Sequence, residues 1–87
     1  MRTIETKNII TEAGKPMQVS YTLIKNENFY GIEIKQTIEN NIEKKIEFFA
    51  ELEAEAEKII ILLAKHDVLI SNMSPILDEV VFKNAQV

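Results

Sequence analysis

Apolar and polar residues alternate along two stretches in the first half of the chain. From Met17 to Leu23 every second residue is apolar, and the residues between are Gln, Ser and Thr. A similar alternation runs from Tyr30 to Ile38. A period of two is typical of a strand with one buried face, and the polar residues 26–28 between the two stretches suit a tight loop. The pattern therefore predicts a β-hairpin.

Another strand is predicted ahead of this hairpin. Residues 3–11 are β-branched and polar by turns, and residues 13–16, Ala-Gly-Lys-Pro, have the composition of a turn. The first half of the chain is thus expected to form at least three consecutive antiparallel strands.

Residues 40–49 fit two periods equally well. As a strand, they place Ile42, Ile46 and Phe48 on one face, with Lys44 interrupting the pattern. As a helix, their apolar residues join a stripe at spacings of three and four that continues to Leu63. A fourth strand and one long helix remain open alternatives here.

The second half of the chain has helical periodicity. A helix is predicted from Glu51 to His66, with one apolar face formed by Leu52, Ala56, Ile59, Ile60 and Leu63.

A short second helix is predicted from Ser74-Pro75 to Phe82. Serine is a good N-cap and proline is tolerated at the first helical position. Asp78 and Glu79 would then lie near the positive end of the helix dipole. Residues 84–87 are expected to fray.

These elements predict one α+β domain over residues 1–87, an antiparallel β-meander of three to four strands with two C-terminal helices packed on one face. The predicted core comprises Val19, Tyr21, Leu23, Ile32, Ile34, Leu52, Ala56, Ile59, Leu63, Leu77 and Val80.

Composition narrows the classes of function. The 87 residues contain no cysteine, so disulfides, thiol nucleophiles and cysteine metal sites are excluded. No apolar run approaches the roughly 20 residues of a membrane span, and no apolar signal region follows the charged N-terminus. The net charge of −4 comes with scattered basic residues, which does not favour nucleic-acid binding. We expect a soluble, cytoplasmic protein.

Several segments resemble a known family. They are Tyr30-Gly31-Ile32-Glu33-Ile34 after the strand 21–24, the helix ending Leu62-Leu63-Ala64, the connection containing Val68, and the small helix 76–80. Over residues 19–81 the chain resembles short uncharacterised proteins of clostridia and related spore-forming bacteria, grouped as a domain of unknown function. The resemblance implies a strand from Ile42 to Phe49, and no catalytic residues.

Candidate chemistry is sparse. His66 is the only histidine and has no partner at a catalytic or metal-binding spacing. Glu51, Glu53, Glu55 and Glu57 alternate with small and apolar residues, which on a helix gives a solvated face with acids near the positive dipole end. We expect no catalytic residue, metal or cofactor.

The favoured hypothesis is a non-enzymatic protein-interaction or regulatory module that binds a protein partner or forms a homodimer. On a helical wheel Ile61 lies almost opposite the apolar face, so Ala54, Ile61 and Leu62 are the candidate interface. One alternative is a metal-dependent or enzymatic domain using the acidic helix and His66. Another is a single-stranded nucleic-acid binder that stacks bases on Tyr21 and Tyr30 of the sheet.

Overall fold

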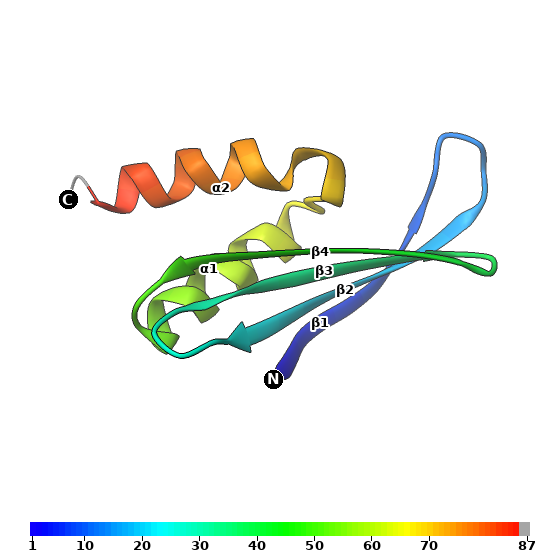
Figure 1. Ribbon diagram of the computed structural model, residues 1–87. Helices are drawn as coiled ribbons and strands as arrows, with labels where there is room; N and C mark the ends of the chain where they lie inside the picture. The colour runs from blue at the N-terminus through cyan, green and yellow to red at the C-terminus, as the bar shows by residue number, and fades with distance from the viewer. Residues whose placement is uncertain (86–87) are drawn as a thin grey trace.

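Four strands precede two helices along the chain (Figure 1). The computed structural model describes the backbone of residues 1–85 and the side chains of residues 1–81. The elements are β1 (Arg2–Ile10), β2 (Pro16–Lys25), β3 (Tyr30–Ile38), β4 (Asn41–Ala50), α1 (Glu53–Lys65) and α2 (Ile70–Ala85). The strands form one antiparallel sheet in the order β1-β2-β3-β4. The predicted α+β meander with two C-terminal helices is confirmed, including its fourth strand, and a single helix over residues 40–66 is wrong.

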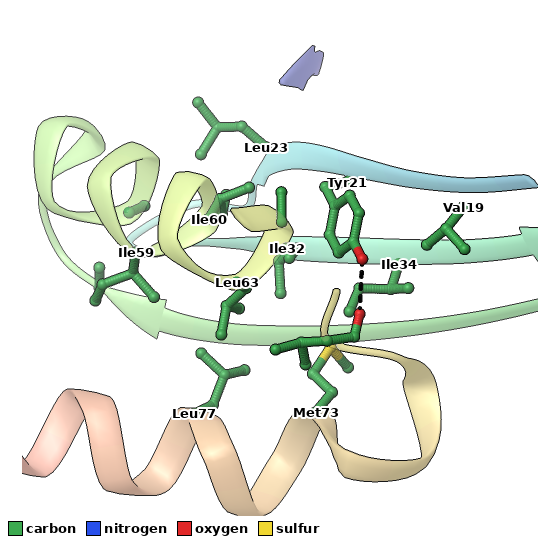
Figure 2. Packing of buried hydrophobic residues seen from close by; sticks show 14 of the residues in the cluster. Val19, Tyr21, Leu23, Ile32, Ile34, Ile59, Ile60, Leu63, Met73 and Leu77 are labelled. Atoms are coloured by element: carbon green, nitrogen blue, oxygen red, sulfur yellow. Dashed lines mark hydrogen bonds between the residues drawn. The ribbon is translucent and has the colours of Figure 1, made fainter. Parts of the chain in front are cut away.

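The core lies between the sheet and the two helices (Figure 2). Tyr21 pairs with Ile34 and Leu23 pairs with Ile32, and cross-strand partners point to the same face of a sheet. That face is covered by α1 and α2, which contribute Ile60, Leu63, Met73 and Leu77 among others. Of the predicted core, nine residues are buried: Val19, Tyr21, Leu23, Ile32, Ile34, Ala56, Ile59, Leu63 and Leu77.

The prediction for Leu52 is wrong, and Val80 is only half-buried. Leu52 is 60% exposed because the helix begins at Glu53, directly after Leu52, and not at Glu51 as predicted. β4 extends to the buried residue Ala50, which pairs with Tyr30. Residues 51–52 are therefore used for the turn from sheet to helix, and Leu52 has an extended backbone at the N-cap. Glu51 accordingly lies outside the helix.

The predicted start of the second helix is also wrong. α2 begins at Ile70, so Pro75 lies inside the helix and deprives it of one backbone hydrogen bond. Two side chains accept hydrogen bonds from the backbone N–H groups at the start of this helix. Gln36 Oε1, from β3, accepts a hydrogen bond from the Ile70 N–H at 2.7 Å, and Asn72 Oδ1 accepts one from the Leu69 N–H at 2.9 Å.

The earlier start removes the predicted dipole role of Asp78 and Glu79, because the first turn contains no acidic residue. At the other end, α2 is helical through Ala85. The remainder of the tail that was predicted to fray, residues 86–87, lies outside the described residues.

The C-terminus of α1 is closed by a Schellman motif. The Val68 N–H donates to the carbonyl of Leu63, and the Asp67 N–H donates to that of Ala64. Asp67 occupies the left-handed position with a φ of 54°, where glycine is more usual. Lys7 of β1 reaches this end, donating to the Ala64 carbonyl at 2.8 Å and pairing with the Asp67 carboxylate at 2.5 Å. The first strand is thereby joined to the helix layer.

Candidate functional site

The exposed apolar residues of β4 lie on the face of the sheet that the helices leave uncovered. Ile46 pairs with Glu33, which alternates with the buried residues Ile32 and Ile34, so Ile46 points away from the helices. The same alternation places its neighbours on this outer face. We call the three residues the β4 row: Ile42, Ile46 and Phe48, which are 57%, 50% and 42% exposed.

The helix side of β4 is polar instead. Lys45 Nζ donates to Ser74 Oγ of α2 at 2.8 Å, and the Ser74 hydroxyl donates to the carboxylate of Glu47. The charged residues of β4 therefore have partners only when they point towards the helices. In Figure 1 α2 runs alongside the part of β4 near Ala50, whereas the hairpin end of β4 extends beyond both helices. Figure 2 shows the same helix beside the strand.

Gly31 fixes how closely β3 and β4 approach at the end of the row. The pairing shifts register between Tyr30 and Gly31, leaving one extra residue in β4. A Cβ at Gly31 would lie 2.1 Å from the Glu47 carbonyl oxygen and 2.7 Å from Phe48 Cα. Only glycine fits this contact, which holds Phe48 beside β3 on the outer face.

Two lysines on neighbouring strands oppose each other beside the β4 row. Lys44, between Ile42 and Ile46, pairs across the strands with Lys35. Like charges directly opposite each other destabilise a sheet. Among the described residues, neither lysine takes part in an ion pair. The outer face thus combines apolar side chains with two lysines that no described carboxylate contacts, although Glu33 lies on the same face.

The predicted interface residues of α1 are exposed but do not form one surface. Ile61 is 51% exposed, and Leu62 and Ala54 are exposed as well. At about 100° per residue, Lys58 and Lys65 lie between the directions of Ile61 and Leu62. The two apolar side chains are therefore on different flanks of the helix.

Ile61 borders a shallow hollow beside the first strand, near the ion pair of Arg2 with Glu57 at 2.7 Å. The hollow is lined by Arg2, Thr3, Ile4, Glu5, Glu57 and Ile61. An interface through Ala54, Ile61 and Leu62 stays a prediction.

His66 and the acidic residues of α1 lie apart. His66 is an exposed residue at the C-cap of the helix, where its backbone N–H donates to the Leu62 carbonyl. Near the other end, Arg2 pairs with Glu57 and also lies 3.8 Å from the carboxylate of Glu53. Within residues 1–81, no group of three or more His, Asp and Glu side chains is placed to hold a metal ion.

Tyr21 does not offer a stacking surface. Its ring is fully buried on the helix side, and its hydroxyl donates to the Val68 carbonyl at 2.9 Å, the dashed line in Figure 2. Burial, followed by the nearby carboxylates of Asp67 and Glu5, raises the pKa of Tyr21 to about 12. Tyr30 is half-buried, with Lys25 Nζ 5.4 Å from the centre of its ring. The pair of tyrosines on which the nucleic-acid-binding alternative relied is thus not available on the sheet.

The β4 row was not among the residues predicted for an interface. Its signal was present, because Ile42, Ile46 and Phe48 share one face in the strand interpretation. Alternation alone does not say which face of a strand meets the helices, so the exposure of the row could not be derived.

Two further observations bear on the class of protein. No helix in the described part of the chain has the length and apolar content to cross a membrane. A family model described as "Family of unknown function (DUF6514)" matches residues 1–83, in agreement with the resemblance to a domain of unknown function. The match says nothing of a clostridial source, which stays a prediction. Comparisons with curated proteins and with solved structures gave no significant match.

Proposed function

The chain belongs to this family of unknown function, DUF6514, and we propose that it acts as a small protein-interaction module that binds a protein partner through the β4 row. In this proposal the domain has no catalytic residue and no cofactor. Its place of action is the cytoplasm, which agrees with the absence of cysteine.

The observation that carries the proposal is the reversed orientation of β4. A strand in a two-layer fold normally turns its apolar side towards the helices. β4 turns Ile42, Ile46 and Phe48 to the outer face and points Lys45 and Glu47 at α2. Exposed apolar residues that gather on one face, unlike scattered ones, are typical of a binding surface.

The fold supports this use of the outer face. Gly31 allows β4 to approach β3 so closely that Phe48 is held on the face. Ile24, which pairs with Gly31 from the other side, is 8% exposed although no helix covers it. The Phe48 end of the row therefore rests on a closely packed part of the sheet, so that this end should cost little to order on binding.

The test compares two isoleucines of equal exposure on opposite sides of the molecule. Ile46→Glu places a charge in the β4 row, and Ile61→Glu places one on the outer side of α1. The two readouts are self-association in sedimentation velocity and capture of partner proteins from a native lysate. We expect Ile46→Glu to abolish whichever of the two the unmodified protein shows. Ile61→Glu should leave both unchanged.

The opposite result would overturn the proposal. Loss of binding with Ile61→Glu alone would assign the interface to Ala54, Ile61 and Leu62 instead. Equal binding by both variants, with circular dichroism showing both folded, would exclude the β4 row as the binding surface.

A further inference from the structure

The charges around the β4 row indicate what its partner presents. We propose that the row and the Lys35–Lys44 pair together bind a protein segment that carries an acidic side chain between apolar ones. This inference rests on the proposed function and specifies the chemistry of the partner at the same surface.

The first step is the placement of the two lysines. They are direct cross-strand partners on the outer face, where their side chains start close together. The described residues supply no carboxylate within ion-pair distance of either ammonium group. The arrangement costs stability in the free protein, and an incoming carboxylate would relieve that cost.

The second step is the contrast with the other cations of the sheet. Arg2 and Lys7 each pair with a carboxylate of the same chain, Lys45 donates to Ser74, and Lys25 lies over the ring of Tyr30. The chain has a net charge of −4, so acidic side chains are in excess over basic ones. A cationic pair without a counterion on such a protein marks a site for an anionic group from another molecule.

The third step is the position of the pair relative to the apolar residues. Lys44 lies two residues from Ile42 and two from Ile46, about 7 Å from each along the strand. The whole row, from Ile42 to Phe48, extends over about 20 Å. An acidic residue flanked by apolar residues would place its carboxylate at the lysines and its neighbours on Ile42 and Ile46.

Partial exclusion of water strengthens this ion pair. A carboxylate that meets two ammonium groups beside apolar side chains is less solvated than one on an open surface, so its attraction is screened less. The lysines would therefore provide specificity for acidic segments, and the β4 row most of the buried area.

The probe for the test is a random peptide library displayed on phage and selected on the immobilised, full-length protein. We expect the enriched peptides to carry Asp or Glu between apolar residues. Synthetic versions should bind Lys44→Gln and Lys35→Gln about threefold to tenfold more weakly than the unmodified protein. Lys65→Gln on α1 is the matched control and should bind them unchanged.

A charge exchange sharpens the test. The double variant Lys35→Glu/Lys44→Glu should prefer peptides in which the acidic residue is replaced by Lys, because a single exchange would only create an ion pair across the strands. Raising the salt concentration should weaken the acidic peptides on the unmodified protein more than neutral ones.

The outcomes separate this inference from the proposed function. Peptides that lose binding with Ile46→Glu but bind both lysine variants normally would overturn the acidic specificity and leave the β4 row as a binding surface. Peptides that are insensitive to Ile46→Glu, or no enrichment at all, would overturn both.

Discussion

β2 and β4 are equally long strands of one sheet, and they turn their apolar sides in opposite directions. Each has ten residues and alternates apolar with polar positions. β2 buries Tyr21 and Leu23 beneath the helices, whereas β4 exposes Ile42 and Ile46 on the other face. β2 lies inside the sheet and β4 at its margin, where Ser74 of α2 bonds to Glu47. Apolar side chains thus build the core in one strand and an exposed row in the other.

The largest expected difference is in the stability lost when an isoleucine is truncated on one or the other face of the sheet. Ile34→Ala should cost about 2–5 kcal/mol of unfolding free energy, because Ile34 is fully buried and its removal leaves a cavity. Ile46→Ala should cost less than about 1 kcal/mol, because half of its surface already meets solvent. Urea denaturation at low protein concentration measures both values. Equal losses would mean that the outer face is covered in the free protein.

A substitution at Gly31 should loosen β4 specifically. Gly31→Ala places a methyl group 2.1 Å from the Glu47 carbonyl oxygen, so β4 has to move away from β3. We expect a loss of about 2–4 kcal/mol and faster amide hydrogen exchange over residues 42–48 than over β2. Gly14→Ala is the control, since Gly14 has open space around its Cβ position and only its φ of 80° resists the change. Unaltered exchange in β4 would show that the sheet absorbs the methyl group.

The hydroxyl of Tyr21 provides a finer comparison within the helix-covered face. Tyr21→Phe leaves the buried Val68 carbonyl without its donor and should cost about 1–3 kcal/mol near neutral pH. Thermal or urea denaturation gives the value, and Tyr30→Phe serves as the control on a half-buried ring. A loss equal to that of Tyr30→Phe would argue against the hydrogen bond.

The same substitution should respond to alkaline pH. The pKa of Tyr21 is raised to about 12 in the folded protein, against about 10 in an unfolded chain. Between these values the unfolded chain loses a proton that the folded protein keeps, so stability falls as pH rises. Tyr21→Phe lacks this loss, and its deficit relative to the unmodified protein should shrink above about pH 10. The pKa of Lys7 is also raised, chiefly by its hydrogen bond to Asp67, so some alkaline destabilisation should remain in both proteins.

The smallest effect is expected at His66. It is exposed at the C-cap of α1, so His66→Ala should change the unfolding free energy by no more than about 0.5 kcal/mol. Partner binding, once measured, should also be unchanged. Loss of metal binding or of a catalytic turnover with this variant would contradict the proposed non-catalytic role.

The strands were predictable where a clear alternation of apolar and polar residues is bordered by residues typical of turns. Residues 17–23 and 30–38 alternate clearly, and the first two turns carry the expected residues, so the first three strands followed from the sequence. The third turn was not predicted, and in it Glu39 has a positive φ of 54°. The sequence of residues 40–49 does not distinguish a strand from a helix, because its apolar pattern fits both periodicities equally well. Pairing with β3 over Tyr30 to Ile38 decides the outcome, and such long-range pairing overrides local propensity.

Other features depended on distant contacts and could not be derived. Ser74-Pro75 is a sound local start for a helix, but Gln36 on β3 satisfies the Ile70 N–H and moves the start earlier. Val68 and Met73 are buried although neither was predicted for the core. Val68 packs there because the Schellman motif turns it back onto the end of α1. The candidate site shared this difficulty, since the register of β4 against β3 determines which of its side chains face the helices.

The link between Lys7 and the end of α1 has a consequence for synthesis of the chain on the ribosome. The polar contacts of β1 with α1 join residues 55 and 57 positions apart in the sequence. The three strands β1, β2 and β3 emerge first, at about 5–20 residues per second, and can pair while α1 is still unmade. For those seconds the apolar side of the nascent meander has no cover. The arrival of residues 53–68 locks the first strand, and the core is closed against aggregation only when Met73 and Leu77 of α2 follow.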